Sequence, residues 1–410
     1  MADKIRYDGF AGGMNNRLDD FDFGDLTSLR NAVNVDILTS GKPRMRAGLV
    51  QRIADAGAHS VFSDGQRIVW ATATALKIAG PNLVARTLLT DVRLADPLSW
   101  LELHGELYFS NERINGKVNA SDAYELWGIT PPEEPPSLVA LAGDRYVMVT
   151  CAFVLTSGEV SGAPVGAKVA CTDTPSILVS NIPQSDDARV VATRLYVTDL
   201  NGRDFYAHAD VPAGVTSYVV AGELCVGEQL KTQFMQPPPL GQLLTFCRGR
   251  IYIASGSNIF RTQPLRYGAY DPEEDFFMEP ERVRLLKGCD DGLYLSSDRT
   301  YFLPDPGAAQ RQRIPVLPYR AIEGAACDLP DSKDVMWFSE RGFVRGSPGG
   351  VVKNLTEGQV DVESVERACM GVIGYRGHEA VVAIARDGTE GLEVSPDFTA
   401  AEAERIDALE

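Results

Sequence analysis

The sequence predicts an all-β fold in which a β-propeller of about six blades carries an inserted β-sandwich. A turn residue followed by strand-forming residues recurs along the 410-residue chain at nearly constant spacing. The six anchors of this signature, separated by 39, 144, 42, 42 and 46 residues, are Ile68, Leu107, Ile251, Leu293, Val335 and Val381. Four steps match the roughly 40–50 residues of a four-stranded propeller blade. The long step exceeds a 42-residue blade by 102 residues, and an antiparallel sandwich domain has about 100 residues.

Each occurrence of the signature predicts one strand of a blade. The six predicted strands span residues 66–70, 105–110, 249–255, 291–297, 334–339 and 378–383. Valine, isoleucine, tyrosine, phenylalanine and tryptophan dominate these stretches, and such residues fit a pleated, buried surface. Six hairpins are therefore visible, and five to seven blades fit the length.

Two proline-rich linkers bracket the predicted insertion. Residues 129–136 contain four prolines and residues 236–239 contain three. Proline cannot donate to a β-ladder and stiffens the chain, as expected of a linker between domains. The resulting domains are an N-terminal arm with a first strand (1–50), a first propeller part (51–130), the insert (131–239), a second propeller part (240–395) and a C-terminal tail (396–410).

The insert contains a series of predicted strands. They cover residues 146–154, 177–179, 190–197, 205–209 and 216–220. The turn Gly158-Glu159-Val160-Ser161-Gly162-Ala163-Pro164 and the strand Thr193-Arg194-Leu195-Tyr196-Val197-Thr198 resemble fibronectin type III domains. The tryptophan found early in many such domains is absent, so the resemblance extends to the wider immunoglobulin-like class. It implies a spacer or docking module and not a catalytic domain.

Helical patterns are few. Residues 361–367 and 400–409 could each form a short helix, the second in the terminal tail. The arm contains glycines at positions 9, 12 and 13, which allow backbone conformations closed to other residues, so we expect an extended segment there.

Charge and composition exclude several function classes. The formal net charge is −17, whereas a protein that grips nucleic acid needs a basic surface. The longest basic cluster, Lys42-Pro43-Arg44-Met45-Arg46, is too short for that purpose. No apolar run is long enough for a membrane span, and the start lacks the apolar region of a signal peptide. Seven dispersed cysteines and four isolated histidines predict reduced thiols and neither a metal site nor a cofactor site.

An enzyme is the competing class, because propellers also carry glycoside hydrolases and sialidases. Those enzymes need two carboxylates about 5–10 Å apart, or a tyrosine nucleophile with an arginine clamp. The candidate acids are Asp271, Glu273, Glu274 and Asp275, which we interpret as a solvated loop between blades. Nucleophile elbows, phosphate-binding glycine loops and HExxH motifs are absent from the sequence. We therefore expect no catalytic residues.

Two passages resemble tail hub or nozzle proteins of short-tailed bacteriophages. The first runs from Gly12-Gly13-Met14-Asn15 through residues 31–36 to Gly41-Lys42-Pro43-Arg44-Met45-Arg46-Ala47-Gly48, and the second covers residues 337–356. In that family a GG-hydrophobic-N opening, an AxN-hydrophobic-D strand and a GxxRxRxG motif precede a propeller. The resemblance identifies an assembly arm with six residues of interest, which are Gly12, Gly13, Asn15, Arg17, Arg44 and Arg46.

The resemblance implies a structural role in a virion that is made in the host cytoplasm. Nozzle proteins form a ring, typically of six subunits, below the portal and its adaptor or head-completion protein. Tail fibre, spike or needle proteins would be further partners, and no membrane anchor is expected. Genomic double-stranded DNA would pass through the lumen without specific binding, because a surface of like charge repels it.

Overall fold

The structure is a computed structural model that describes residues 9–17, 27–30, 32, 34–38, 40–46, 50–308, 310–330, 332–359, 365–375 and 378–387. The predicted strands and blades lie largely inside these ranges, whereas the predicted terminal helix (400–409) lies outside them. The chain divides into two compact units, one formed by residues 53–279 and the other by residues 1–52 together with 280–410.

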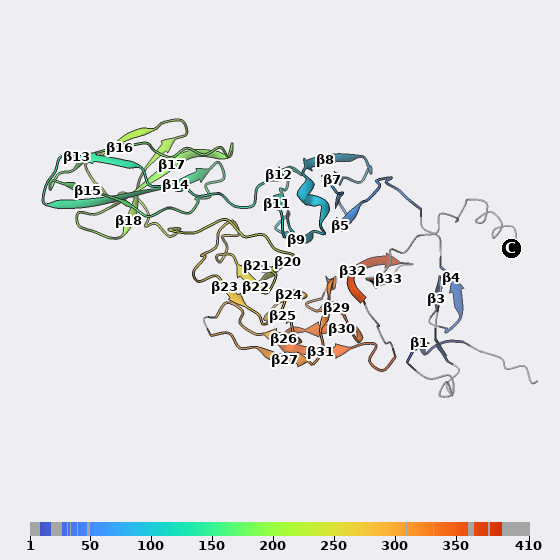
Figure 1. Ribbon diagram of the computed structural model, residues 1–410. Helices are drawn as coiled ribbons and strands as arrows, with labels where there is room; N and C mark the ends of the chain where they lie inside the picture. Colours follow the sequence, from blue (N-terminus) through green and yellow to red (C-terminus); the bar gives the residue numbers. More distant parts are fainter. Residues whose placement is uncertain are drawn as a thin grey trace, which may run out of the picture. The chain divides into compact units, whose positions relative to one another are not determined.

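Outside the insert, the unit of residues 53–279 contains three four-stranded antiparallel sheets, each a simple meander (Figure 1). The first comprises β5 (His59–Ser63), β6 (Ile68–Ala71), β7 (Ala75–Ala79) and β8 (Ala85–Thr90). A 3-10 helix, η1 (Val92–Ala95), leads to β9 (Ser99–Leu103), β10 (Glu106–Ser110), β11 (Asn115–Val118) and β12 (Tyr124–Glu125). The third comprises β20 (Leu243–Cys247), β21 (Arg250–Ser255), β22 (Asn258–Arg261) and β23 (Phe276–Met278).

The other unit contains two further meanders of the same kind. One comprises β24 (Leu285–Cys289), β25 (Gly292–Ser296), β26 (Thr300–Leu303) and β27 (Ile314–Leu317). The next comprises β28 (Ala321–Asp328), β29 (Val335–Ser339), β30 (Gly342–Ser347) and, after the 3-10 helix η2 (Pro348–Gly350), β31 (Val351–Asn354). These four-stranded sheets are blades of the β-propeller type, as predicted.

The sequence signature marks the second strand of each blade. The first five anchors lie on β6, β10, β21, β25 and β29. All five residues of β25 and all five of β29 are buried. A second strand is flanked by strands on both sides and its two faces are buried, so most of its residues are apolar. This double burial explains why the signature was visible in the sequence.

Within each unit, successive blades pack face to face. One core joins Val69 and Leu76 of the first blade to Leu107 and Phe109 of the second. A serine hydroxyl also joins the second blade to the third, because Ser110 at the end of β10 accepts a hydrogen bond of 3.0 Å from the backbone N–H of Gly241, just before β20.

The same contact recurs in the other unit. A second core joins Tyr294 on β25 to Trp337 on β29. There the hydroxyl of Ser296, at the end of β25, accepts a hydrogen bond of 3.0 Å from the N–H of Ala321, the first residue of the next blade.

The sixth signature forms a long hairpin, β32 (Val365–Tyr375) with β33 (His378–Asp387), and not a separate four-stranded sheet in the described part of the chain. A parallel pair between Glu323 and Arg367 joins this hairpin to β28. We expected a helix at 361–367. The structure describes residues 365–367 of this segment, and they belong to β32, so the expectation is wrong there. Pairing with β33 overrides the weak local helical preference.

The insert consists of two antiparallel sheets (Figure 1). The three-stranded sheet has the order β13 (Ser137–Ala140), β16 (Ser176–Ser180), β19 (Ser217–Ala221). The four-stranded sheet has the order β15 (Ala167–Cys171), β14 (Arg145–Leu155), β17 (Val190–Thr198), β18 (Phe205–Pro212). All five predicted strands are present, whereas β13 and β15 were missed. Both sheets contribute to one core, which includes Val149, Ile177, Leu195 and Val220.

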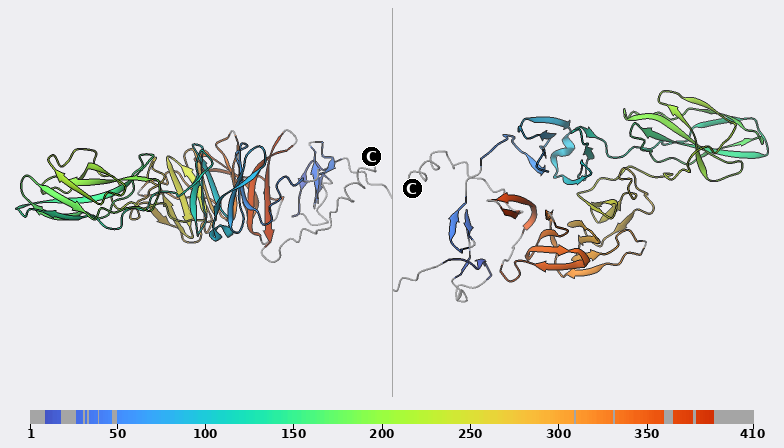
Figure 2. Two further views of the ribbon diagram at one scale, coloured as in Figure 1. Left: turned by 90° about the horizontal axis from the view of Figure 1, so that it is seen from above. Right: turned by 180° about the vertical axis from the view of Figure 1, so that it is seen from behind.

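The insert occupies the connection between two consecutive blades, as the long step in the spacing predicted. It follows β12 and precedes β20. The right-hand view in Figure 2 shows two separate chain segments between the green insert and its neighbouring blades. All seven cysteines are free thiols, as predicted. In the part of the chain that the structure describes, no helix is long and apolar enough to cross a membrane.

Candidate functional site

Of the predicted arm residues, Gly13 and Arg44 lie on two pairs of short strands, and Gly12, Asn15, Arg17 and Arg46 lie beside them. β1 (Gly13–Met14) pairs in parallel with β2 (Ser28–Leu29), and β3 (Val35–Ile37) pairs with β4 (Pro43–Met45). Gly12 and Asn15 donate backbone hydrogen bonds to Thr27 and Leu29, at 2.9 and 2.8 Å. The backbone N–H of Phe10 donates to the carbonyl of Gly41. The described parts of the arm are therefore extended, as expected from its glycines, and they form short paired strands.

The arm contacts its own unit at two points. Asn16 donates a backbone hydrogen bond of 3.0 Å to Gln359. The hydroxyl of Tyr375, on β32, donates to the carboxylate of Asp36, on β3. These contacts fix both paired elements of the arm relative to the unit that carries them.

The three arm arginines differ in whether they form an ion pair. Arg46 forms an ion pair of 3.0 Å with Asp36. Arg17 and Arg44 are exposed, and neither guanidinium forms an ion pair with any residue that the structure describes. Those two side chains remain available to an acidic partner.

The junction between the insert and the blades is tightly packed. Gly128, at the start of the first linker, has a φ of +83°. A Cβ atom there would lie 2.5 Å from the carbonyl oxygen of Gly268 and 2.9 Å from Cδ of Pro238. Gln236 and Tyr270 exchange backbone hydrogen bonds of 3.0 and 2.9 Å. Both linkers and the loop after β22 therefore meet at Gly128, which leaves no room for a larger residue.

Arg189 clamps the insert to the linker. Its guanidinium donates to the carbonyl oxygens of Leu126 and Gly128, each at 2.9 Å. Three further bonds reach the carboxylate of Asp187, at 2.7, 3.0 and 3.1 Å. The hydrogen bonds from Arg189 hold the pKa of Asp187 below its usual range. Because one guanidinium spans a carboxylate and two carbonyls, the angle of the insert is set by charge-assisted bonds.

Apolar contacts support the clamp. Ile129 of the first linker packs with Phe153 and Leu155 of β14 and with Val190 beside Arg189. The proline-rich linkers thus hold the insert in one orientation and are not free hinges; we call this arrangement the seat of the insert. Stiffness, the property expected from their composition, is supplied chiefly by these contacts.

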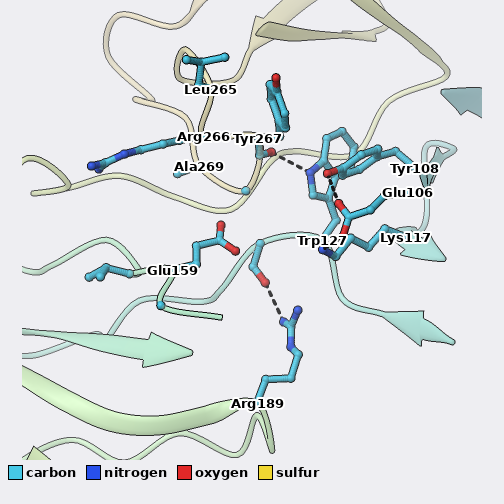
Figure 3. A pocket seen from close by; sticks show the side chains of 14 residues that line it. Glu106, Tyr108, Lys117, Trp127, Glu159, Arg189, Leu265, Arg266, Tyr267 and Ala269 are labelled. Carbon is cyan, nitrogen blue, oxygen red and sulfur yellow. Dashed lines mark hydrogen bonds and ion pairs between the residues drawn. The ribbon is translucent and has the colours of Figure 1, made fainter. Parts of the chain in front are cut away.

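A pocket of about 330 Å³ opens at this junction (Figure 3). Its walls come from the second blade, the insert turn 158–160, the clamp residue Arg189 and the loop 265–269. Trp127 is almost wholly buried and donates its indole N–H to the carbonyl of Tyr267 at 2.7 Å. This bond ties the first linker to the loop of the third blade.

One side of the pocket carries a closed polar network. The hydroxyl of Tyr108 donates to Glu106 at 2.6 Å, and the ammonium of Lys117 donates to the same carboxylate at 2.7 Å. Burial alone would raise the pKa of Glu106, but these two hydrogen bonds outweigh it and the pKa is lowered. Burial and the bond to Glu106 raise the pKa of Tyr108 far above its ordinary value. Tyr108 is therefore held protonated, which makes it a poor nucleophile.

Glu159, on the insert side of the pocket, has no such network. Its side chain is exposed, and its carboxylate forms no hydrogen bond or ion pair with the residues described. Desolvation by the surrounding wall raises the pKa of this carboxyl, and nearby Lys117 and Arg189 offset part of the rise. Figure 3 shows the carboxylate turned toward the middle of the pocket.

The acidic loop after β22 is not uniformly solvated, so our expectation for Asp275 is wrong. Asp275 is 2% exposed and receives ion pairs of 3.1 Å from Arg250 and 2.9 Å from Arg261. It also accepts the backbone N–H of Asp271 at 3.0 Å. A buried carboxylate with two guanidinium partners closes the loop of its blade.

The remaining candidate acids do not belong to any group of side chains that could bind a metal ion, among the residues that the structure describes. Asp271 accepts the backbone N–H of Glu273, a local turn contact, and Glu274 is exposed. Among the residues that the structure describes, no group of three or more His, Cys, Asp and Glu side chains is placed to hold a metal ion.

Sequence reasoning missed the junction residues Arg189, Trp127 and Glu159. Glu159 lay inside a turn that we had quoted only as a resemblance, and no local pattern marks Arg189. The pocket joins segments separated by more than 100 residues, so only the packing of the blades could reveal it. The one available signal was a glycine, Gly128, directly before a proline-rich linker.

No protein-family model matches the chain, and no curated protein matches it. Solved structures are similar only at a distance. A catalytically inactive virginiamycin B lyase from Staphylococcus aureus is 11% identical with a TM-score of 0.33, covering 82% of this chain and 94% of its own. AztD from Citrobacter koseri is 13% identical with a TM-score of 0.35, covering 81% and 84%. The Neurospora crassa Pan2 WD40 domain is 11% identical with a TM-score of 0.31, covering 80% and 85%.

We expect Gly128→Ala to destabilise the unit of residues 53–279 by about 2–4 kcal/mol, because backbone strain and a steric clash act together. The matched control is Gly158→Ala. Gly158 has the same φ of +83°, but nothing lies within 4 Å of its added Cβ. The control should lose only about 1 kcal/mol. Urea unfolding of both variants measures the difference, and equal losses would show that the linkers do not meet tightly at Gly128.

We expect Arg189→Ala to release the insert from its seat, at a cost of about 2–3 kcal/mol for the lost charge-assisted hydrogen bonds. Limited proteolysis should then cleave residues 129–136 at least tenfold faster than in the unchanged protein. Arg145→Ala is the control, because exposed Arg145, at the start of β14, pairs with Asp173 and lies at the opposite end of that strand from Leu155 and the linker. Equal cleavage rates for the two variants would contradict the clamp.

Proposed function

We propose that this protein is a structural virion component, a subunit of the tail hub or nozzle ring of a short-tailed bacteriophage. Its role would be to form the DNA exit channel below the portal and adaptor and to help retain the genome. The observation that carries the proposal is the fixed seat of the insert, in which Arg189 and the crossing at Gly128 set its angle. A module held at one angle repeats at regular positions around a symmetric particle.

The insert itself suits a docking role, and we propose that it is an immunoglobulin-like domain of the fibronectin type III kind. Its four-stranded sheet has the order β15-β14-β17-β18, and its second sheet shares the same core. Such sandwiches present loops and sheet faces to partners while the core stays closed. Tail fibre, spike or needle proteins would bind there.

The blades favour a structural over a catalytic role. Their conspicuous buried carboxylate, Asp275, is neutralised by Arg250 and Arg261, and the tyrosine at the junction pocket is held protonated. Neither arrangement offers the free carboxylate pair or activated tyrosine that a glycoside hydrolase or sialidase requires. Because this chemistry gives no specific support to the enzymatic alternative, we propose a protein without catalytic function.

The charge supports passage of DNA without capture. With a formal net charge of −17, the surface of a ring of six subunits would repel the phosphate backbone and let it slide. The arm, with exposed Arg17 and Arg44, would attach the ring to the adaptor or head-completion protein. The proposed location is the virion tail, after synthesis in the host cytoplasm.

The test of the proposed function is the presence of the protein in purified virions. Mass spectrometry should detect it there in a fixed ratio of about six copies per particle, as expected for a closed ring. Electron microscopy of the purified protein or of isolated tails should show sixfold rings. Absence of the protein from virions would exclude the proposal, whatever its oligomeric state.

The arm generates a separate prediction. Replacing both Arg17 and Arg44 with glutamate should weaken attachment to the adjoining tail ring at least tenfold, because two attractive charges become repulsive. Neither side chain pairs with a described residue, so the blades should unfold at an unchanged temperature. Lys353→Glu, an exposed position on β31, is the control for a change in charge. Unchanged attachment of the double variant in co-sedimentation would show that the arm arginines are not the anchor.

A further inference from the structure

The pocket at the junction has properties that a docking function does not require. Its volume of about 330 Å³ lies in the range of sites that hold small ligands. Its walls are fixed from several directions, by the Trp127–Tyr267 bond, by the Arg189 clamp and by the bonds within the second blade. A cavity whose walls are held in this way is preorganised, so ligand binding would not carry the entropy cost of ordering the walls.

The charged side chains around the pocket are paired, with Glu159 and Arg266 as the exceptions. Lys117 is shared between Glu106 at 2.7 Å and Glu125 at 3.6 Å. Arg189 is used by Asp187 and by two carbonyl oxygens. The carboxylate of Glu159 has no partner among the described residues and lies inside the pocket.

Arg266 does not neutralise Glu159. It lies on the rim, is exposed, and forms no ion pair with any described residue. Figure 3 shows its side chain running away from the Glu159 carboxylate. The carboxylate therefore keeps its full capacity to accept hydrogen bonds from a cation that enters the pocket.

Gly268 makes room for the carboxylate of Glu159. A Cβ atom on Gly268 would lie 2.1 Å from Oε1 of Glu159, so any other residue at position 268 would clash with the carboxylate and displace it. Tyr108 and Trp127, both 4% exposed, also line the pocket, and their ring centroids lie 5.2 Å apart. Aromatic side chains in the same pocket as a carboxylate suit an organic cation, because ring faces attract positive charge.

We propose that the junction pocket binds an organic cation, an alkyl guanidinium or alkyl ammonium group, through the carboxylate of Glu159. The inference is independent of the proposed function, since it rests only on the geometry of the pocket. The cation would donate two or more charge-assisted hydrogen bonds to the carboxylate, while its alkyl stem would lie along the aromatic wall. A free small molecule and an arginine or lysine side chain of a partner protein share this chemistry.

The experiment is a titration of the full 410-residue protein with n-butylguanidinium and n-butylammonium, followed by calorimetry and saturation-transfer NMR. Both cations should bind saturably at one site, whereas neutral n-butylurea, which has the same shape, should not. Glu159→Gln should weaken binding at least tenfold, in line with the loss of charge-assisted hydrogen bonds. Glu223→Gln, an exposed glutamate elsewhere on the insert, should bind as the unchanged protein does.

Two further variants sharpen the test. Arg266→Ala removes a like charge from the rim, so it should raise the affinity for both cations, and a lower affinity would overturn the placement of the cation at Glu159. Thermal unfolding of Glu159→Gln should occur at or above the temperature of the unchanged protein, because desolvation by the pocket wall disfavours the charged carboxylate that the substitution removes. Weaker binding by that variant therefore cannot be ascribed to misfolding.

The source of the cation is decided by comparing n-butylguanidinium with the peptide acetyl-Ala-Arg-Ala-amide. Affinity at least tenfold higher for the peptide assigns the pocket to a partner's side chain, and equal or lower affinity assigns it to a free small molecule. The proposal is overturned if neither the cations nor the peptide bind saturably. It is also overturned if n-butylurea binds equally well, or if Glu159→Gln binds as tightly as the unchanged protein.

Discussion

The structure depends on the burial of one strand in each blade on both of its faces. A four-stranded meander cannot bury its two faces alone, so its neighbours must cover them. The second strand lies inside its sheet and receives the tightest packing, with all of β25 and β29 buried. Each blade therefore needs an adjacent blade, and the cores around Phe109 and Trp337 supply that contact within each unit.

The same constraint determines what the sequence could reveal. The second strands carry a continuous apolar run, so their spacing predicted five of the blades and located the insert. Outer strands such as β8 are largely exposed, so they lack a continuous apolar run that would distinguish them from loops in the sequence. The helix expected at 361–367 failed because strand pairing in β32 is set by a partner that lies beyond a local window. Local preference is weak against such pairing.

The junction was beyond prediction for a different reason. Arg189 is an ordinary charged residue in the sequence, and its importance comes from two carbonyl oxygens more than 60 residues earlier in the chain. Asp275 was misread as a solvated acid because its partners, Arg250 and Arg261, lie on other strands of its blade. Polar groups acquire their role from what surrounds them, whereas apolar periodicity is already present in the chain.

The meeting of the two linkers at Gly128 also bears on how the protein folds. The second and third blades share a core around Ile251 and Trp127, yet 117 residues separate β12 from β20. Closing a flexible loop costs about 0.6 kcal/mol for each doubling of its length. The insert has a core of its own, and its ends come together where Gly128 passes Pro238. Once folded, it turns a long loop into a short one, so the insertion brings consecutive blades together instead of separating them.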